Sequence, residues 1–424
     1  MMIIIFVFTL ALFFLSCDAV NSTVAFPLKV SDSKRYLVEQ NNQPFLYHAD
    51  TGWQLIWKLT KDEAELYLEN RRQKGFTAIQ LQLLPHRLNQ TNRDGHNPFL
   101  SPGDFANPNP AYFEHADWVL TRAGQKGFCV MLAPNWLSAW EQDWRHYLNE
   151  ENAENWGRYV GTRYGTFNHV MWMHGGDVDP GDLTEETRLV AKGIRATAPH
   201  QLQTYHAGAK SSSNFFHTDD WLDWNTAYNY GDVYPQVYED YSKKPIKPVF
   251  LGESHYEDNN NDQYAYRMRK QAYWAMLSGA VGHAYGHGSI WQFTEHWVKG
   301  MDAPGAFQMR HVRSLLEPRK WYDLAPDMEH RTVVNGYESG DNYAPAARST
   351  DGRLVLVYMP TIRTITVDMS KLAGSVKAVW YDPASGTYTD VGEFDNTGKV
   401  DFKPSGTNSD GESDWVLILG VQDG

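Results

Sequence analysis

The pattern of apolar and polar positions changes character once along the chain. From about residue 45 to residue 316, short strand-like segments alternate with longer stretches of helical periodicity. After residue 327 only short apolar runs remain, separated by turns rich in Gly, Asn, Asp and Pro. Alternating strand and helix predicts a parallel α/β architecture, whereas short strands between turns predict an all-β sandwich.

Eight short segments in the first region are strand candidates, at 45–50, 76–84, 128–133, 169–173, 202–206, 224–229, 248–252 and 280–285. Helical stretches lie between them, and Thr60 followed by Glu63 forms a capping-box start for the first. Eight such alternations are typical of a (β/α)8 TIM barrel. A doubly wound sheet is the alternative, but no Gly-x-Gly-x-x-Gly turn follows the first strand.

The predicted fold class is therefore α/β, a (β/α)8 TIM barrel followed by a small all-β sandwich domain. We place the barrel at residues 25–328 and the sandwich at 330–424. The sandwich strands expected from the pattern are 354–358, 364–368, 376–381 and 415–419.

The N-terminus predicts export. Residues 2–16 are almost wholly apolar and polar residues follow at once, so we interpret residues 1–20 as a signal peptide. Leu15-Ser16-Cys17 resembles the end of a bacterial lipobox, which leaves open a lipid anchor at Cys17. The expected location is secreted, periplasmic or cell-surface. The only other cysteine, Cys129, lies in an apolar run and predicts inert core packing.

The net charge of the chain limits the classes of partner that it is expected to bind. The formal net charge is −13 and no basic cluster is present. Binding to nucleic acid or to an anionic membrane surface is therefore not expected, the lipid anchor apart.

Two of the expected strands end in an acidic residue. One apolar run leads through Gly175 and Gly176 to Asp177, and another leads through Gly252 to Glu253. Side chains at the carboxyl ends of barrel strands form the active sites of this fold, and a carboxylate pair is what glycosidic hydrolysis needs. We predict a glycoside hydrolase with Asp177 as general acid/base and Glu253 as nucleophile.

Other expected strand ends carry residue types that recognise sugar hydroxyls or stack on sugar rings. The predicted substrate-binding residues are Asp50, His86, Asn135, Trp136, His174, His206, Tyr228, Tyr230, His255, Tyr285 and Trp291. Any single histidine among them is more often a core residue than a ligand, so the clustering at one face carries the prediction.

Two other chemistries are disfavoured. His283 and His287 have the spacing of metal ligands on a helix, but Gly282, Gly286 and Gly288 argue against a helix there. No Gly-x-Ser-x-Gly elbow of a serine hydrolase is present. We therefore expect no metal and no cofactor.

A set of short motifs in matching order resembles a known family. The motifs are Ala49-Asp-Thr-Gly-Trp53, Gly75-Phe-Thr-Ala-Ile-Gln80, Ala111-Tyr-Phe-Glu-His115, Gly175-Gly-Asp177, Thr204-Tyr-His206, Ser211-Ser-Ser213, Gly252-Glu253, Tyr256-Glu-Asp258, Gly286-His-Gly288 and Gln308-Met-Arg-His311. From about residue 27 to 320 the chain resembles the apiosidase-like catalytic domain of glycoside hydrolase family 140. The C-terminal module resembles the β-sandwich that follows it, often labelled a collagen-binding domain.

The resemblance implies a barrel that cleaves apiose-containing side chains of the plant pectin rhamnogalacturonan II. It also implies that the catalytic Asp and Glu of the family fall on Asp177 and Glu253. The expected partner is thus a plant cell-wall polysaccharide or oligosaccharide. A retaining mechanism is expected, and an inverting mechanism stays open as the alternative.

Two functions of another class stay open at this stage. One is a non-catalytic glycan-binding protein on a hydrolase-like barrel, which would bind without turnover. The other is a collagen- or peptide-binding adhesin, which would bind through residues 330–424 alone.

Overall fold

The computed structural model describes residues 24–137, 143–259 and 264–421. The signal peptide predicted at 1–20 and the lipid anchor considered at Cys17 lie outside these ranges. Within them, no helix combines the length and the apolar character needed to cross a membrane.

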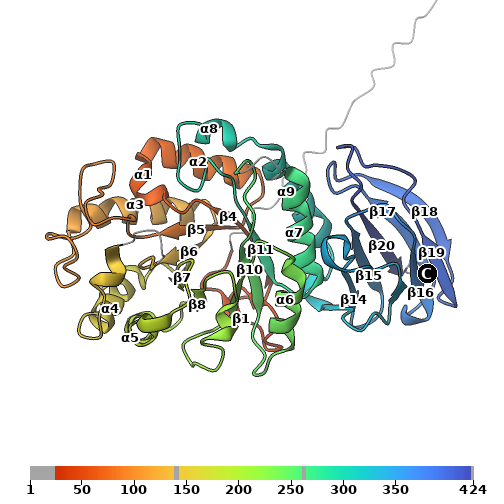
Figure 1. The fold of residues 1–424 in the computed structure, drawn as a ribbon, viewed down its shortest axis with the longest axis horizontal. Helices are drawn as coiled ribbons and strands as arrows, with labels where there is room; N and C mark the ends of the chain where they lie inside the picture. Colours follow the sequence, from red (N-terminus) through yellow and green to blue (C-terminus); the bar gives the residue numbers. More distant parts are fainter. Residues whose placement is uncertain (1–23, 138–142, 260–263, 422–424) are drawn as a thin grey trace, which may run out of the picture.

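Eight parallel strands form the central sheet, in the order β8-β7-β6-β5-β4-β11-β10-β9 (Figure 1). The strands are β4 (Tyr47–Thr51), β5 (Ala78–Gln82), β6 (Cys129–Ala133), β7 (Val170–Gly175), β8 (Gln203–His206), β9 (Asn225–Tyr228), β10 (Val249–Glu253) and β11 (Gly282–Tyr285). Every residue in them is buried, because helices cover the outside and side chains fill the inside. All eight strands predicted from the sequence are confirmed within a residue or a few of their expected bounds.

Polar contacts between β8 and β9 complete the ring. The backbone N–H of Asp223 donates to the carbonyl of Gln203 over 2.9 Å. The Thr204 hydroxyl donates to the carbonyl of Trp224 over 2.8 Å and lies 2.7 Å from the hydroxyl of Thr226. The sheet is thus a nearly closed barrel, which brings the carboxyl ends of all its strands to one rim.

Helices follow the strands around the outside (Figure 1). They are α1 (Leu55–Lys58), α2 (Lys61–Gln73), α3 (Pro110–Gln125), α4 (Ala153–Tyr164), α5 (Thr184–Thr197), α6 (Val233–Ser242), α7 (Ala265–Leu277), α8 (Trp297–Gly300) and α9 (Pro304–Leu316). The predicted capping box begins α2: the Thr60 hydroxyl accepts from the Glu63 backbone N–H, and the Glu63 carboxylate accepts from the Thr60 backbone N–H.

Residues 324–421 form two antiparallel sheets (Figure 1). One has the order β12-β14-β15-β20-β17-β18, with β12 (Leu324–Pro326), β14 (Ala346–Ser349), β15 (Leu354–Met359), β20 (Trp415–Val421), β17 (Val376–Tyr381) and β18 (Tyr388–Phe394). The other joins β13 (Val333–Asn335), β16 (Ile365–Asp368) and β19 (Lys399–Phe402). A hydrophobic cluster of inward residues from both sheets fills the space between them, so the predicted sandwich is confirmed.

A third small sheet precedes the barrel. It consists of β1 (Lys29–Val30), β2 (Leu37–Val38) and β3 (Pro44–Phe45), paired antiparallel.

The sandwich packs against α7 of the barrel (Figure 1). Arg269 on α7 makes a two-pronged ion pair with Asp414, at 3.0 and 2.8 Å, and both side chains are fully buried. The Tyr273 and Tyr358 rings stack with centroids 4.9 Å apart. Leu356 and Ile418 of the sandwich belong to the same hydrophobic cluster as the barrel core, so the two modules share buried apolar surface.

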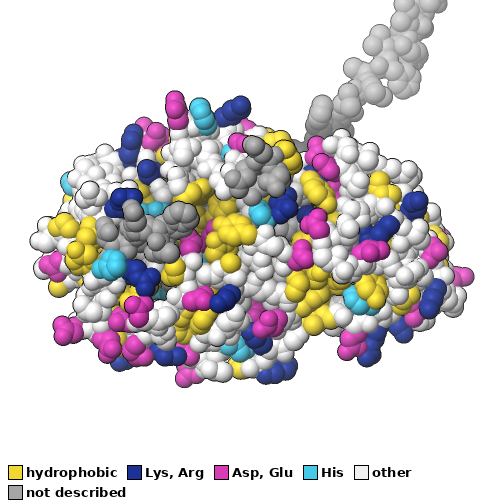
Figure 2. Space-filling view, viewed as in Figure 1, with side chains coloured by type: hydrophobic (Ala, Val, Ile, Leu, Met, Phe, Trp, Pro, Cys, Tyr) yellow, Lys and Arg dark blue, Asp and Glu magenta, His cyan; other side chains and the backbone are white. Residues whose placement is uncertain are grey.

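Charges of both signs are interspersed over the face seen in Figure 2, where Lys and Arg side chains lie among Asp and Glu. This mixed distribution is unlike the continuous basic surface that nucleic-acid binding uses.

Candidate active site

A glycine turn at the end of β7 presents Asp177. Gly175, Gly176 and Asp177 all have positive φ, at 84°, 136° and 54°. A Cβ on Gly176 would lie 2.4 Å from the indole of Trp136, so only glycine lets this ring lie against the turn. The turn therefore redirects the chain at the strand end and seats the Asp177 carboxyl beside Trp136.

Glu253 is the last residue of β10, and its carboxylate is held from two sides. The Tyr230 hydroxyl donates to Oε1 over 2.9 Å. The Nε2 atom of His206 lies 3.2 Å from Oε2. Glu253 is only 6 % exposed, so these contacts and its position on the strand fix its orientation.

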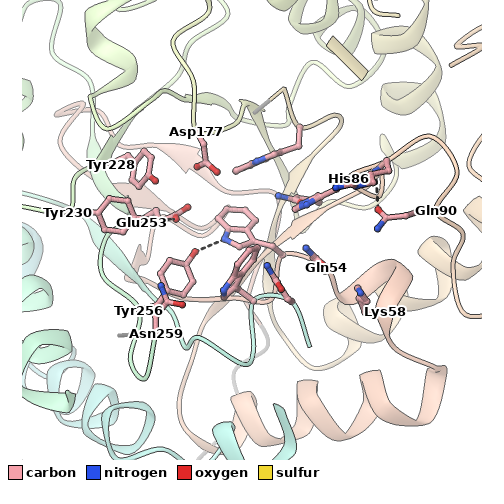
Figure 3. A pocket seen from close by; sticks show the side chains of 16 residues that line it. Gln54, Lys58, His86, Gln90, Asp177, Tyr228, Tyr230, Glu253, Tyr256 and Asn259 are labelled. Carbon is pink, nitrogen blue, oxygen red and sulfur yellow. Dashed lines mark hydrogen bonds between the residues drawn. The ribbon is translucent and has the colours of Figure 1, made fainter. Parts of the chain in front are cut away.

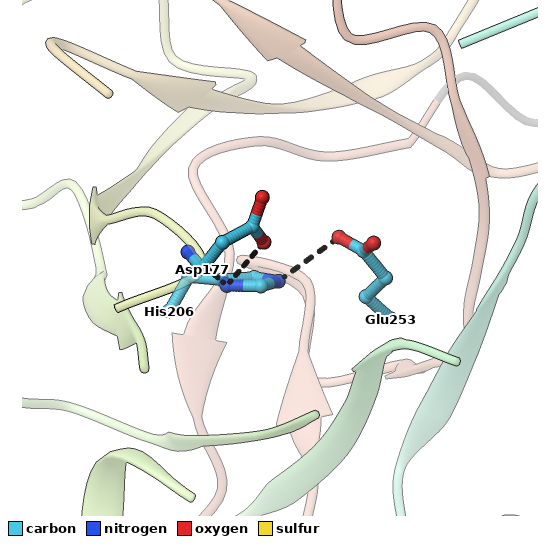
Figure 4. A group of neighbouring side chains, drawn as sticks. All are labelled: Asp177, His206 and Glu253. Carbon is cyan, nitrogen blue, oxygen red and sulfur yellow. Dashed lines mark hydrogen bonds and ion pairs between the residues drawn. The ribbon is translucent and has the colours of Figure 1, made fainter. Parts of the chain in front are cut away.

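His206 ends β8 and lies between the two carboxyl groups (Figure 4). Its Nδ1 atom lies 3.8 Å from Asp177 Oδ1, and its Nε2 atom faces Glu253. The ring is fully buried and packs against Tyr228 and Trp136, with centroids 4.6 and 5.1 Å away. The strand-end predictions for Asp177, His206 and Glu253 thus converge on one point of the barrel rim.

The surroundings of the site shift the pKa values of its titratable groups. Burial, and then the negative charge of Glu253, raise the pKa of Asp177 from 3.8 to about 7. Burial acts to lower the pKa of His206, but contact with Glu253 and the charges of both carboxylates outweigh it and raise that pKa. The arrangement can therefore hold a proton on Asp177 beside an ionised Glu253.

Asp177 and Glu253 face into a cleft of about 840 Å³ (Figure 3). Its lining combines flat aromatic rings with amides and charged groups. The lining residues are Trp53, Gln54, Lys58, Gln82, His86, Arg87, Gln90, Trp136, Asp177, Tyr228, Tyr230, Glu253, Tyr256, Asn259, Trp291 and Gln292. Aromatic faces for sugar rings and hydrogen-bonding groups for hydroxyls are the composition that a carbohydrate site needs.

Five of the predicted substrate-binding residues line this cleft: His86, Trp136, Tyr228, Tyr230 and Trp291. His206, a sixth predicted residue, lies beside the carboxyl groups of Asp177 and Glu253. The Nε2 atom of His86 lies 2.7 Å from the Gln82 amide oxygen. Burial lowers the pKa of His86 to about 4, which keeps its ring neutral at pH 7.

The other five do not line this cleft, and their contact with substrate stays a prediction. Asp50 is fully buried and accepts from Arg71 Nε over 2.8 Å, so it is an ion-pair partner of the barrel wall. His174 lies 2.8 Å from the amide oxygen of Gln203. Tyr285 donates to the carboxylate of Glu257 over 2.5 Å.

Asn135 and His255 complete this group. Asn135 is 3 % exposed and immediately precedes Trp136, which takes the position in the lining. The ring of His255 packs edge-on against Tyr230, with centroids 5.4 Å apart, and lies 2.7 Å from Arg267. A strand end marks the correct rim of the barrel, but neighbouring residues there alternate between facing the cleft and facing the wall.

Several lining residues were not predicted from strand ends. Trp53 and Gln54 follow β4 by two and three residues, and the Trp53 indole donates to the Tyr256 hydroxyl over 2.7 Å. Lys58 ends α1, a short helix that the sequence pattern did not indicate. Trp53 was visible in the sequence as the last residue of the motif Ala49-Asp-Thr-Gly-Trp53. It directly follows the glycine that comes after the strand.

One carboxylate oxygen each from Asp177 and Glu253 and a ring nitrogen of His206 lie within 4.8 Å of one another. Among the residues that the structure describes, this is the one group of three whose donor atoms are close enough for a shared ion. The histidine lies between the two carboxyl groups and can itself carry a positive charge there, so we assign no metal to the group.

Comparison with protein families gives two matches. The family described as "Apiosidase-like, catalytic domain" matches residues 31–323. The family described as "Putative collagen-binding domain of a collagenase" matches residues 326–420. The resemblance seen in the sequence motifs is thus confirmed for both parts of the chain. A search of curated proteins found no match.

Solved structures with the same arrangement include a protein titled "Glycoside hydrolase", at 29 % identity and a TM-score of 0.86, covering 93 % of this chain and 97 % of that one. A glycoside hydrolase family 5 from Bacteroides vulgatus ATCC 8482 has 26 % identity and a TM-score of 0.85, with 93 % of each chain covered. A GH30 endoxylanase from Clostridium papyrosolvens C71 has 11 % identity and a TM-score of 0.53, covering 89 % of this chain and 97 % of that one, and supports the fold alone.

Proposed function

The chain belongs to the apiosidase-like family of glycoside hydrolases, and from this premise we propose that it cleaves apiose-linked side chains of the plant pectin rhamnogalacturonan II by a retaining mechanism. In this proposal Asp177 is the general acid/base and Glu253 is the nucleophile. The single observation that carries it is the pairing of a carboxyl group of raised pKa with a second, oriented carboxylate across one cleft.

The spacing of the two carboxyl groups supports retention. An oxygen of Asp177 and an oxygen of Glu253 lie within 4.8 Å of each other. Retaining enzymes hold the two groups about 5–5.5 Å apart, whereas inverting enzymes hold them about 6.5–9.5 Å apart to admit a water molecule. A separation of this size therefore supports retention in the proposal.

In the first half-reaction Glu253 attacks the anomeric carbon while Asp177 gives its proton to the glycosidic oxygen. The bond from the anomeric carbon to the leaving oxygen breaks, and an ester bond from the sugar to Glu253 forms. The leaving group departs as a neutral alcohol. Tyr230, which donates to Glu253 Oε1, orients the carboxylate for this attack.

In the second half-reaction Asp177 is ionised and acts as the base. It takes a proton from water, whose oxygen attacks the anomeric carbon and releases Glu253 as a carboxylate. Asp177 is then protonated again and Glu253 is again ionised, which restores the starting state.

The substrate class rests on the family and on the composition of the cleft. Trp53, Trp136 and Trp291 supply apolar ring faces. The amides of Gln54 and Gln90 supply donors and acceptors for sugar hydroxyls. The apolar run at residues 2–16 supports export to the compartment where such a polysaccharide is met.

The test is sugar release from a panel of pectic glycans, including rhamnogalacturonan II, by the wild type, Asp177→Asn and Glu253→Gln. The wild type is expected to release apiose-containing product, and each variant is expected to lose about 10²–10⁴-fold in rate while still binding the glycan. Binding by all three proteins with no product from any of them would make the chain a non-catalytic glycan-binding protein instead.

Stereochemistry is tested by adding methanol to the wild-type reaction. A retaining enzyme transfers the sugar from its ester with Glu253 to methanol, giving a methyl glycoside of the substrate's anomeric configuration. An inverting enzyme gives only the free sugar of opposite configuration, and that product would overturn the assignment of Glu253 as nucleophile.

A further inference from the structure

His206 is the third titratable group of the site, and it differs from the other buried histidines of the barrel. It is fully buried, yet its two ring nitrogens face two carboxyl groups, at 3.2 Å for Glu253 and 3.8 Å for Asp177. Its Nδ1 atom also lies 3.2 Å from the carbonyl oxygen of Ala207 and 3.4 Å from the backbone nitrogen of Asp177. The shorter of these two contacts, to a carbonyl acceptor, is the one that a protonated Nδ1 makes. The remaining titratable group against the ring is Tyr228.

We infer that His206 is a fixed imidazolium counterion that pairs with Glu253 in the first half-reaction and with Asp177 in the second. The inference rests on the proposed function, and it assigns His206 as a positioning residue. It replaces the sequence-based interpretation of this side chain as a contact for substrate.

The charges of the three groups support a pairing of His206 first with Glu253 and then with Asp177. In the free enzyme Asp177 is protonated, His206 carries one positive charge and Glu253 one negative charge, so their sum is zero. Once the sugar is esterified to Glu253, Asp177 is ionised and Glu253 is neutral, and the sum is again zero. A buried site disfavours net charge, so a cation placed between the two carboxyl groups lets both states exist without moving any group.

Within the part of the chain that the structure describes, no other cation takes this place. Among the described residues, His206 is the one basic side chain that forms an ion pair with Asp177 or with Glu253. Its protonation follows from the same geometry, because an ionised Glu253 at 3.2 Å favours the charged form of the buried imidazole. The raised pKa of His206 agrees with this.

The first test does not depend on turnover. The protein is labelled with ¹⁵N-histidine, and the imidazole signals are followed against pH by NMR, with the His206 signal assigned by its loss in His206→Gln. The ring is expected to stay protonated at pH 7 in the wild type, and its pKa to fall by about one unit or more in Glu253→Gln and by less in Asp177→Asn. A neutral His206 at pH 6 in the wild type, or a titration unchanged by Glu253→Gln, would overturn the inference.

The second test uses the glycan that the wild type cleaves most rapidly in the pectic panel. In His206→Gln, loss of the positive charge makes ionisation of both carboxyl groups harder. Both limbs of the pH profile of kcat/KM are therefore expected to move to higher pH. A purely structural role would lower the rate and leave the limbs in place, and that result would overturn the inference.

His283→Gln is the matched control. His283 also lies on a barrel strand and is 2 % exposed, but its Nε2 atom lies 3.0 Å from the Nδ1 atom of His48. Burial lowers the pKa of His283 to about 3, so its substitution removes no charge at working pH. The pH limbs of this variant are expected to coincide with those of the wild type. If the wild type cleaves no glycan, the proposed function fails, and the NMR titration still decides the protonation of His206.

Discussion

The protonation of Asp177 sets the expected upper pH limit of activity. Its pKa is raised to about 7 by burial and by the charge of Glu253, and only its protonated form can act as the acid. We expect kcat/KM to fall as pH rises through about 7, with one proton lost in the basic limb. In Asp177→Asn this limb is expected to be absent from the residual rate. A basic limb that persists unchanged in that variant would assign the acid to another group.

The same carboxyl group predicts a pH-dependent stability. Because its folded pKa of about 7 lies above its ordinary value of 3.8, the folded state binds this proton more tightly than the unfolded state. The stability that the proton contributes is full below about pH 4 and is lost as pH rises through 7. Asp177→Asn is therefore expected to be more stable than the wild type at pH 8, by on the order of 1–3 kcal/mol.

Urea unfolding of both proteins at pH 5 and pH 8 measures this difference. The advantage of Asp177→Asn is expected to be larger at pH 8 than at pH 5, because the wild type keeps an ionised and poorly solvated carboxylate only at the higher pH. An advantage that is equal at the two pH values would mean that Asp177 is already ionised at pH 5.

Individual site residues could be predicted from the sequence only where they lie at the end of a predicted strand. His206 and Glu253 each end a strand and Asp177 lies two residues beyond one, and the barrel geometry brings such positions together. Asp50 occupies an equivalent position, but Arg71 on α2 reaches it and makes it part of the wall. The approach of a residue from a neighbouring helix depends on packing in three dimensions, so the pattern along the chain did not distinguish these cases.

At the scale of elements, the geometry of the turn after β7 predicts that one methyl group added at Gly176 strongly lowers activity. In Gly176→Ala the added Cβ would lie 2.4 Å from the Trp136 indole, at a φ of 136° that side chains other than glycine rarely adopt. The turn must then shift and carry Asp177 with it. We expect kcat to fall by about 10²-fold, since a displacement near 1 Å at a catalytic group has that order of effect.

The matched control for this turn is Gly127→Ala. Gly127 also has a positive φ, of 84°, but nothing lies within 4 Å of its added Cβ. It is expected to lose about 1–2 kcal/mol of stability from backbone strain and to keep its activity. Equal loss of activity in both variants would attribute the effect of Gly176→Ala to general destabilisation.

Elements were predictable in proportion to their length and burial. The eight barrel strands are fully buried, and those that are continuous apolar runs, such as Cys129–Ala133, show directly in the pattern along the chain. Strands β8 and β9 consist mostly of polar residues and were predicted from their place in the alternation of strands and helices. The two-residue strands β1 to β3 are too short to show any period. Strand β18 is exposed along most of its length, so its polar composition, Tyr388–Phe394, carries no alternation of apolar and polar residues. Pairing with β17 creates this strand, and pairing is not encoded locally.

At the scale of the whole molecule, the buried contact between α7 and the sandwich predicts that the two modules unfold together. Arg269 and Asp414 are both fully buried, and Asp414 also accepts from Asn408 and Tyr358. Removing Arg269 leaves a buried charge without its partner, which costs about 3–5 kcal/mol. Because the hydrophobic cluster of the barrel extends into the sandwich, Arg269→Met is expected to lower one common transition.

Differential scanning calorimetry measures this coupling. Arg269→Met is expected to give a single endotherm at lower temperature. The double variant Arg269→Met/Asp414→Leu removes the stranded charge but also the acceptor of Asn408 and Tyr358, so it is expected to recover only part of the loss. Lys377→Met is the control, since Lys377 pairs with Asp390 at the exposed surface of the sandwich and its loss is expected to leave the transition in place. Two endotherms, with only one of them moved by Arg269→Met, would show that the sandwich unfolds independently. Its contact with the helix that follows the Glu253 strand would then have no part in stabilising the catalytic barrel.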